Sequence, residues 1–208
     1  MTKSGKLIGI TGGVGSGKSL VLKYLKEACD CEILIADDIA RDLQKKGGVC
    51  YAPMVEVFSE DALQTDGELD RAKIASMIFE DEDLRKKANA IVHPAVKEEV
   101  ERITAGIRAH DPEKTVFLES AIFVEAGYLG ILDELWLVCA DKTKREERLR
   151  ENRGYSREKI ENIMESQFSD EEYRSYADVV IDNSGTMDET VRNVEKLFTG
   201  RWRSGKAL

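Results

Sequence analysis

A glycine-rich segment near the N-terminus combines residue types and spacing that suit phosphate binding. Residues 12–19 match the pattern G-x-x-x-x-G-K-[ST] in full. Glycines let backbone N–H groups curve around an anion, and a helix that begins near the lysine adds the positive end of its dipole. We expect Lys18 to reach the β- and γ-phosphates of a nucleotide and the Ser19 hydroxyl to bind Mg²⁺. The predicted phosphate-binding residues are Gly12, Gly13, Val14, Gly15, Ser16, Gly17, Lys18 and Ser19.

The residues on either side place this segment where a strand turns into a helix. The apolar run Leu7-Ile8-Gly9-Ile10 precedes it, and Val21, Leu25 and Ala28 follow at helical spacing. The alternative is a glycine-rich turn that binds nothing, but chance matches to the pattern usually lack this strand and helix. The context therefore favours a phosphate loop.

Two adjacent carboxylates follow the second strand-like run of the chain. Asp37 and Asp38 come directly after residues 32–36, and ligands of parallel sheets bind at the carboxyl ends of the strands. A carboxylate there accepts a proton from an acceptor hydroxyl or helps to hold Mg²⁺. The alternative is a helix cap, a common role of aspartate. We expect Asp37, which comes first, to be catalytic and Asp38 to cap the helix.

A basic segment follows the fourth strand-like run. Residues 142–157 contain seven basic and three acidic side chains, a local charge of +4 in a chain whose net charge is −9. This excess predicts a lid whose arginines neutralise charge on a transferring phosphoryl group. The alternative is a solvated helix face with Glu–Arg pairs, which explains some of these residues and leaves the excess unexplained.

Five short apolar runs alternate with amphipathic stretches along the chain. They have the length of strands and are mostly apolar at successive positions, as expected for parallel strands that are covered on both faces. The pattern predicts an α/β sandwich. The runs span residues 6–11, 32–36, 115–119, 134–140 and 178–182.

A helical interval interrupts this alternation between the second and third strands. Leu84, Ala88 and Ile91 lie on one helical stripe, and a second stripe begins at Val96, with Pro94 in the first turn of a second helix. We therefore predict a helical subdomain inserted into a nucleotide-binding core. The predicted boundaries are 1–60 and 111–200 for the core, about 141–160 for the lid within it, 61–110 for the subdomain and 201–208 for a tail.

Composition limits the partners and the compartment. The 208 residues are 34% charged and 42% hydrophobic, which is ordinary for a soluble globular protein. We expect a cytoplasmic protein with no membrane partner, because no stretch is apolar enough to span a bilayer and the N-terminus lacks the hydrophobic core of a secretory signal. The net charge of −9 argues against nucleic acid as a partner. The four cysteines form no C-x-x-C pair, so reduced thiols are expected.

The motifs, taken together and in this order, resemble the dephospho-CoA kinase family. Besides the phosphate loop, the resemblance rests on Ala36-Asp37 with Ile39-Ala40-Arg41, on Gly67 to Arg71, on Ile91-Val92-His93-Pro94, and on Gln167 followed by residues 177–185. It covers nearly the whole chain. It implies transfer of phosphate from ATP to the ribose 3′-hydroxyl of dephospho-CoA, the last step of CoA synthesis. It also implies a P-loop fold with five parallel strands, a helical CoA domain and a lid.

The resemblance further implies roles for single residues. The nucleotide base is expected near Asn183 and Gly185, and Arg148 in the lid is expected to stabilise charge on the moving phosphoryl group. For His93, the start of a helix before Pro94 is an equal alternative to substrate binding. The residues expected to contact dephospho-CoA are Arg41, Arg71, His93 and Glu125.

Three positions depart from the pattern of the family. Ile35 stands where the family has its first aspartate, which leaves Asp37 to act alone. Residues 121–125 lack the proline of the family but keep Glu125. In the lid, the second arginine is absent at its usual spacing or displaced to Arg153, so Arg148 is the safer candidate.

Two other classes of function stay open at this point. A nucleoside or nucleotide kinase would share the loop, the carboxylate and the lid, but not the patterns at residues 67–71 and at His93-Pro94. A nucleotide switch without catalysis would need a guanine-reading N-K-x-D element, which does not occur. The expected partners are the small molecules ATP and dephospho-CoA, and the expected assembly is a monomer or a small homo-oligomer.

Overall fold

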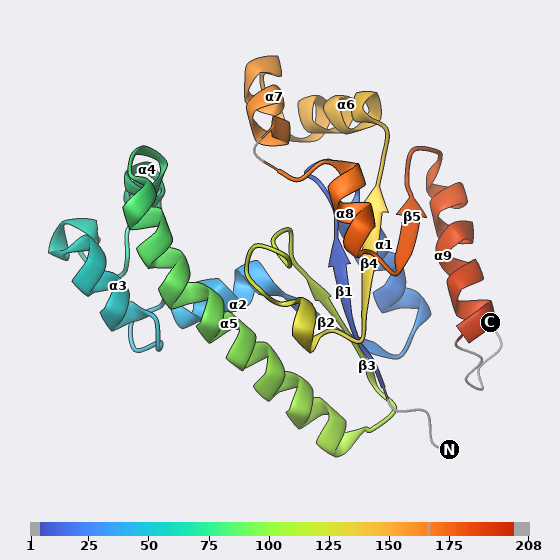
Figure 1. Ribbon diagram of the computed structural model, residues 1–208, viewed down its shortest axis with the longest axis horizontal. Coiled ribbons are helices and arrows are strands. Elements are labelled where there is room, and N and C mark those ends of the chain that lie inside the picture. The colour runs from blue at the N-terminus through green and yellow to red at the C-terminus, as the bar shows by residue number, and fades with distance from the viewer. Residues whose placement is uncertain (1–4, 166, 202–208) are drawn as a thin grey trace. The chain divides into compact units, whose positions relative to one another are not determined.

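The computed structural model describes residues 5–165 and 167–201. Its five strands form one parallel sheet in the order β2-β3-β1-β4-β5 (Figure 1). The predicted α/β fold with a five-stranded parallel sheet is therefore confirmed. The strands are β1 (Leu7–Thr11), β2 (Cys31–Ile35), β3 (Thr115–Glu119), β4 (Glu134–Cys139) and β5 (Val179–Asp182).

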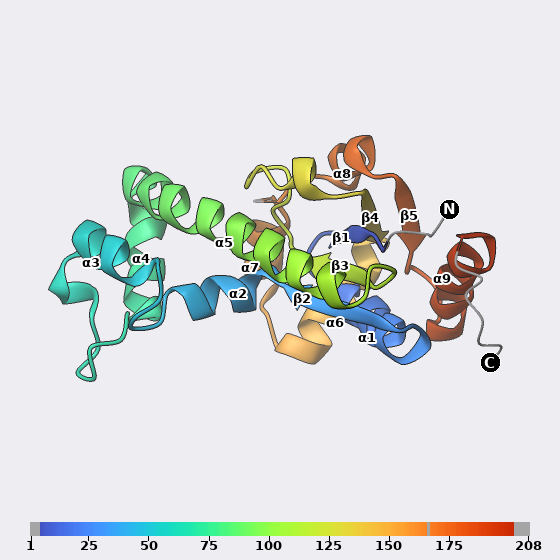
Figure 2. The ribbon, with the colours of Figure 1, turned by 90° about the horizontal axis from the view of Figure 1, so that it is seen from below.

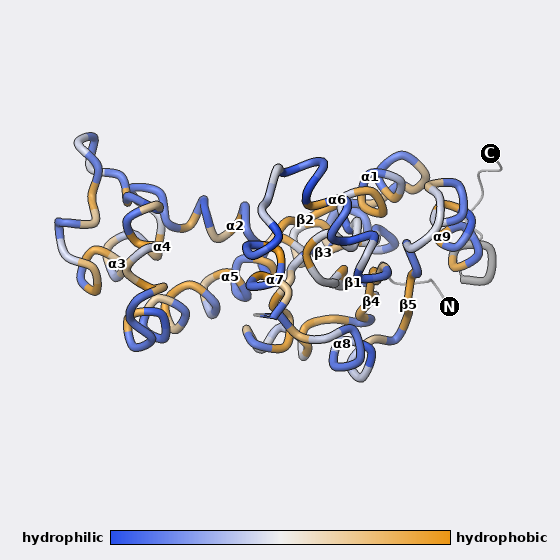
Figure 3. Tube along the Cα trace, turned by 90° about the horizontal axis from the view of Figure 1, so that it is seen from above, coloured by the Kyte–Doolittle hydropathy of each residue, from blue (hydrophilic) through white to orange (hydrophobic). Residues whose placement is uncertain are grey.

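The central strands are buried along their whole length, which explains their continuous apolar sequences. All five residues of β1 are buried, including Ile8 and Ile10 at 0% exposure, so neither face of this strand meets solvent. Figure 2 shows the reason, since α8 lies on one side of the sheet and α1 and α9 lie on the other. A strand covered on both faces has no solvent side, so it does not alternate. At the edge of the sheet, β5 also appears largely in the hydrophobic colour in Figure 3, but its residues alternate between buried and exposed.

The chain divides into two compact units. The first contains the sheet except the end of β2, and it consists of the residues up to Ile33, Glu113–Ala121 and the residues from Leu132 onward. The second consists of Leu34–Pro112 and Ile122–Ile131. The helices of the first unit are α1 (Lys18–Ala28), α6 (Lys142–Arg153), α7 (Arg157–Glu165), α8 (Asp170–Tyr176) and α9 (Met187–Arg201).

The second unit is helical and has a core of its own. Met54, Phe58 and Ala88 belong to its buried cluster. The long helix α5 packs against α2, α3 and α4, so the unit begins at Leu34 and not near residue 61, where the sequence analysis set the boundary. Residues 122–131 also belong to it. Its helices are α2 (Ala36–Leu43), α3 (Tyr51–Phe58), α4 (Arg71–Glu80) and α5 (Glu82–His110), with short 3₁₀ helices at Glu60–Ala62 and Leu129–Ile131.

Helix α5 corrects the prediction of two helices that meet at Pro94. It runs without interruption through Pro94, although proline costs a backbone hydrogen bond inside a helix. The buried side chains Ala88, Val96 and Val100 lie on both sides of the proline. Burial of this shared apolar face offsets the lost bond, and Asp81 caps the start of the helix by accepting from the N–H groups of Asp83 and Leu84.

The C-terminal helix also differs from its predicted end. α9 continues to Arg201, so the predicted tail at 201–208 starts inside the helix, and residues 202–208 lie outside the described part of the chain. At the start of this helix, the Thr186 hydroxyl accepts from the Glu189 N–H, and the Glu189 carboxylate accepts from the Thr186 N–H. Within residues 5–165 and 167–201, the structure has no helix that is long and apolar enough to cross a bilayer.

Candidate nucleotide site

The phosphate loop lies at the carboxyl edge of the sheet, between the end of β1 and the start of α1. β1 pairs with β3 on one side and with β4 on the other, with Ile10 beside Glu119 and Thr11 beside Leu137. The loop therefore leaves the sheet between two strands that end at the same edge. This is the place where ligands of parallel sheets bind.

Three glycines of the loop have conformations that other residues would strain. Gly12, Gly15 and Gly17 have φ values of 146°, 78° and 94°, in the region that L side chains rarely adopt. A Cβ atom would also collide with the carbonyl oxygen of Val138 at Gly12 and with the side-chain amide of Asn183 at Gly17. Helix α1 starts directly after Gly17, so its unbonded first N–H groups face the loop.

Lys18 is held at the loop by two groups of the first unit. Its Nζ donates to the Gly12 carbonyl oxygen at 2.6 Å and lies 3.8 Å from a carboxylate oxygen of Glu119. Only 14% of the side chain is exposed. The ammonium group therefore has a defined position at the loop before a phosphate binds. Glu119 is not among the site residues predicted from the sequence, although its place at the end of a predicted strand is a usable signal.

The oxygen atoms near the loop suit Mg²⁺ and a phosphate chain. The Ser19 hydroxyl is exposed in the first turn of α1, and a carboxylate oxygen of Glu119 lies 3.8 Å from Lys18 Nζ. Mg²⁺ prefers such oxygen ligands and keeps several waters and phosphate oxygens. No group of three or more metal-ligating side chains occurs among the described residues, and a site completed by phosphates and water does not need one.

Two hydroxyl groups of the loop region are buried without a partner. Thr11 Oγ1 and Ser16 Oγ make no hydrogen bond within the part of the chain that the structure describes. Buried polar groups are nearly always satisfied, so an unpartnered one calls for an explanation, such as a ligand or an ion. The two hydroxyls therefore agree with a loop that is completed by a polar ligand.

Arg148 lies at the phosphate loop. Its Nη1 donates to the carbonyl oxygens of Gly15 and Ser16 at 3.4 and 3.3 Å, and its Nη2 donates to the Asn183 carbonyl oxygen at 2.8 Å. Arg153, the other lid candidate, instead lies 5.9 Å from the ring centre of Tyr155. Of these two arginines, only Arg148 has a place at the loop.

Asn183 and Gly185 lie in the turn after β5. The Asn183 amide nitrogen donates to the Ser16 carbonyl oxygen at 2.7 Å, and its amide oxygen accepts from the Thr190 hydroxyl at 2.6 Å. The side chain is buried and joins the loop to α9. At Gly185, a Cβ atom would collide with the Glu189 carboxylate. Contact between this turn and a nucleotide base stays a prediction.

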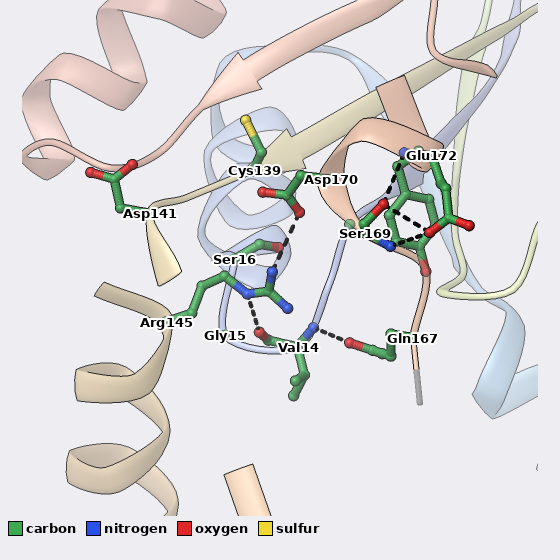
Figure 4. A network of polar contacts seen from close by, with 12 residues as sticks. Val14, Gly15, Ser16, Cys139, Asp141, Arg145, Gln167, Ser169, Asp170 and Glu172 are labelled. Atoms are coloured by element: carbon green, nitrogen blue, oxygen red, sulfur yellow. Dashed lines mark hydrogen bonds and ion pairs between the residues drawn. The ribbon is translucent and has the colours of Figure 1, made fainter. Parts of the chain in front are cut away.

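Two further side chains hold the loop, and Figure 4 shows both. Gln167 accepts from the Val14 N–H at 2.8 Å, and Arg145 donates through Nε to the Val14 carbonyl oxygen at 2.9 Å. In the sequence, Gln167 is notable only as part of the family resemblance, and Arg145 only as one of the basic residues of 142–157. Their contacts depend on how α6 and α8 pack, which no local pattern encodes.

The second unit holds the predicted acceptor residues. Asp37 is exposed in the first turn of α2. The prediction that Asp38 caps this helix is wrong. Helix α2 begins at Ala36, before Asp38, and the Asp38 carboxylate forms an ion pair with Arg41 at 2.7 Å. Arg71 Nη2 donates to the Arg41 carbonyl oxygen at 2.8 Å. Two predicted substrate contacts are therefore neighbours.

His93 and Tyr128 form a contact within the second unit. The Tyr128 hydroxyl donates to the His93 carbonyl oxygen at 3.1 Å, and the two rings meet edge to face at 6.4 Å between their centres. Burial lowers the pKa of the half-buried His93 imidazole. Burial, and then the charge of Asp37, raise the pKa of Tyr128 to about 12. Glu125 is exposed in the same segment as Tyr128.

The parallel sheet, the glycine loop before α1 and the lysine at its end define a P-loop nucleotide-binding protein. The family model for dephospho-CoA kinase matches residues 6–189. The chain therefore belongs to the dephospho-CoA kinase family.

Individual relatives agree with this assignment. A dephospho-CoA kinase of Streptococcus pyogenes serotype M3 is 36% identical over 191 residues, which cover 91% of this chain and 94% of the relative. The crystal structure of TT1252 from Thermus thermophilus is similar with a TM-score of 0.82 at 29% identity, covering 97% of this chain and 100% of the other. A dephospho-CoA kinase from Campylobacter jejuni shares the fold, with a TM-score of 0.69 at 18% identity over 93% of this chain and 95% of the other.

Proposed function

We propose that this chain transfers the γ-phosphoryl group of ATP to the ribose 3′-hydroxyl of dephospho-CoA, giving coenzyme A and ADP. The observation that carries the proposal is a complete phosphate loop, with Lys18 already held at Gly12 and Glu119, in a chain of this family. We place the reaction in the cytoplasm and expect a monomer or a small homo-oligomer. The partners are small molecules and not nucleic acid, in line with the net charge of −9.

The donor side of the reaction follows from the chemistry of the loop. The first N–H groups of α1 and the Lys18 ammonium group bind the phosphates of ATP. Arg148 offsets the negative charge of the γ-phosphoryl group as it moves. Residues 12–19 thereby hold the donor in line with the acceptor, and most of the catalysis comes from this positioning.

The acceptor side depends on a carboxylate. Asp37 accepts the proton of the 3′-hydroxyl while that oxygen forms its bond to the γ-phosphorus and the bond from phosphorus to the bridging oxygen of ADP breaks. Its exposed position at the start of α2 leaves it accessible to a substrate. Arg41, Arg71, His93 and Glu125 are the proposed contacts to dephospho-CoA.

Mg²⁺ is the proposed metal cofactor. It neutralises charge on the β- and γ-phosphate oxygens when bound. Ser19 is its proposed protein ligand, because the hydroxyl is exposed at the start of α1.

The test is an assay of ADP release with a panel of acceptors. The purified chain with ATP and Mg²⁺ is given dephospho-CoA, nucleosides, nucleoside monophosphates or no acceptor. We expect ADP to be released with dephospho-CoA and mass spectrometry to detect coenzyme A. Turnover with a nucleoside or a nucleotide alone would favour another small-molecule kinase, and equal ADP release without acceptor would refute the transfer.

The matched control is Lys18→Ala. Without the ammonium group the transfer should be lost while the protein remains folded by circular dichroism, because the lysine lies at the loop and not in the apolar core. Near-normal turnover of this variant at saturating ATP would contradict the role assigned to the loop.

A further inference from the structure

Arg145 is a charged side chain in a place where solvation of the charge is poor. It lies in the first turn of α6, and only 8% of the residue is exposed. Its helix carries five further basic residues, among them the exposed Arg150. Burial of a guanidinium group is costly unless its charge and its N–H groups have partners. The partners of Arg145 therefore indicate what the residue does.

The first partner of Arg145 is the phosphate loop itself. Nε donates to the Val14 carbonyl oxygen at 2.9 Å, and the Val14 N–H donates to Gln167 at 2.8 Å. Both polar groups of Val14 are thus bound by side chains from outside the loop, as Figure 4 shows. The loop is held by protein contacts on either side of one residue.

The second partner is Asp170, at the start of α8. Arg145 Nη1 lies 3.3 Å from its carboxylate oxygen, and both side chains are mostly buried. Arg145 precedes most of α6 and α7, whereas Gln167 and Asp170 follow α7. The three residues therefore join the two ends of the helical segment 142–165 to each other and to the loop.

The packing leaves little freedom between these parts. A Cβ atom at Gly13 would collide with the Arg145 guanidinium group, and one at Gly15 would lie 2.9 Å from the Arg145 carbonyl oxygen. The start of α6 cannot shift by much without displacing the loop, because close-packed groups transmit such displacements. A change in the loop on nucleotide binding must likewise act on α6.

We propose that Arg145 is a positioning residue that couples the helical segment 142–165 to the phosphate loop, with Asp170 orienting its guanidinium group. Arg145 acts through Val14 and touches no reacting atom. Nucleotide binding at the loop then also stabilises the segment. The proposal rests on the proposed function only in taking ATP as the nucleotide.

The test compares Arg145→Lys with Arg150→Lys, which makes the same change at an exposed site of the same helix. Lysine keeps the charge but cannot reach Val14 and Asp170 with a planar, forked group. Binding of a non-hydrolysable ATP analogue is measured by calorimetry, and exchange of the backbone amides of residues 142–165 is measured with and without the analogue. Neither readout needs an acceptor, so a failure of the acceptor assignment leaves the test intact.

For Arg145→Lys we expect affinity for the analogue to fall roughly 10- to 100-fold, the effect of losing one hydrogen bond to a charged group. The analogue should no longer protect the amides of residues 142–165 from exchange, and the KM for dephospho-CoA should stay unchanged. Arg150→Lys should behave as the wild type. A lower melting temperature with unchanged affinity and unchanged protection would overturn the proposal, since Arg145 would then serve stability alone.

Asp170→Asn provides a second variant in case Arg145→Lys does not fold. It keeps the shape of the side chain and removes its charge, so we expect a smaller loss of affinity and partial loss of amide protection. In the double variant the two losses should not add, because both changes act on one contact. Additive losses, or full protection in Asp170→Asn, would contradict a shared path from the loop to α8.

Discussion

At the scale of single residues, the proposed acceptor side contains two adjacent carboxylates that differ in their contacts. Asp37 and Asp38 are adjacent in sequence, and both are exposed in the first turn of α2. They differ in their contacts, because Asp38 pairs with Arg41 whereas the charge of Asp37 contributes to the raised pKa of Tyr128. The two carboxylates can therefore be separated by substitution.

Asp37→Asn should lower kcat by roughly two to four orders of magnitude while ATP affinity changes little. The amide keeps the shape of the side chain but does not accept the proton of the hydroxyl. Steady-state kinetics and ATP calorimetry measure both quantities. If Asp37 mainly holds Mg²⁺, a higher metal concentration or another metal should instead restore part of the rate.

Asp38→Asn is the control for this experiment. It removes an exposed ion pair, which is worth about 0.5 kcal/mol or less, and should leave kcat nearly unchanged. An equal loss of kcat in both variants, without rescue by metal, would show that the roles of the two carboxylates were assigned wrongly.

His93 should make the stability of the second unit depend on pH. Burial lowers the pKa of its imidazole, so below the ordinary value of about 6.5 the unfolded chain binds a proton that the folded chain does not bind. This contribution to the unfolding free energy is fully present above about pH 6.5 and is lost as the pH falls toward the folded pKa. Urea unfolding between pH 7.5 and 5 measures it.

His93→Gln should weaken this pH dependence, whereas His110→Gln should preserve it. These are the two histidines of the chain, and His110 is exposed at the end of α5. The same slope in the wild type and in His93→Gln would mean that the half-buried imidazole does not carry the effect.

At the scale of elements, two buried hydrogen bonds join α9, the turn after β5 and the phosphate loop. Thr190 donates to the amide oxygen of Asn183, and the amide nitrogen of Asn183 donates to Ser16. All three residues are buried. The orientation of the Asn183 amide therefore depends on a helix that begins after the turn.

Thr190→Val keeps the volume of the side chain and removes the donor. It leaves the Asn183 amide oxygen buried without this bond, so the free energy of unfolding should fall by about 1–3 kcal/mol. Chemical denaturation measures the change. Asn193→Ala, which removes an exposed 3.4 Å bond to the Asp182 carbonyl oxygen, is the control and should cost clearly less. Equal costs would argue against a special role for the buried bond.

At the scale of the whole molecule, the proposed donor-side and acceptor-side residues belong to different units. The loop, Glu119, Arg145 and Arg148 belong to the unit with the sheet, and Asp37 with the proposed substrate contacts belongs to the helical unit. Each unit has an apolar core of its own. ATP and dephospho-CoA should therefore protect different backbone amides from hydrogen exchange.

Dephospho-CoA should slow amide exchange in residues 61–110 more than ATP does, because the helical unit supplies the surface for a long substrate. The unit boundaries extend this expectation to residues 34–60 and 122–131. ATP alone should act mainly on the loop and on residues 142–165. Mass spectrometry of exchanged peptides tests both parts, and equal protection of residues 61–110 by ATP alone would contradict the assignment.

The sequence alone determined the sheet, the phosphate loop and the family. Runs that are apolar at successive positions predict buried parallel strands, and the loop is short enough for its glycines, Lys18 and Ser19 to be recognised from spacing. A further local feature is the cap of α4. Asp70 directly precedes this helix and caps it by accepting from the Lys73 N–H. Such features depend on neighbours in sequence, where local rules hold.

Only the tertiary structure decided the features that depend on packing between distant segments. Helix α5 passes through Pro94 because a shared apolar face offsets the missing hydrogen bond. Asn183 joins the loop to α9, and Arg145 meets Val14 across 131 positions of sequence. In the composition of the chain, Arg145 is only one more positive charge. Its contacts form when α6 packs beside the loop. Because a buried guanidinium group is costly without partners, it pairs with the polar groups that this packing brings close to it.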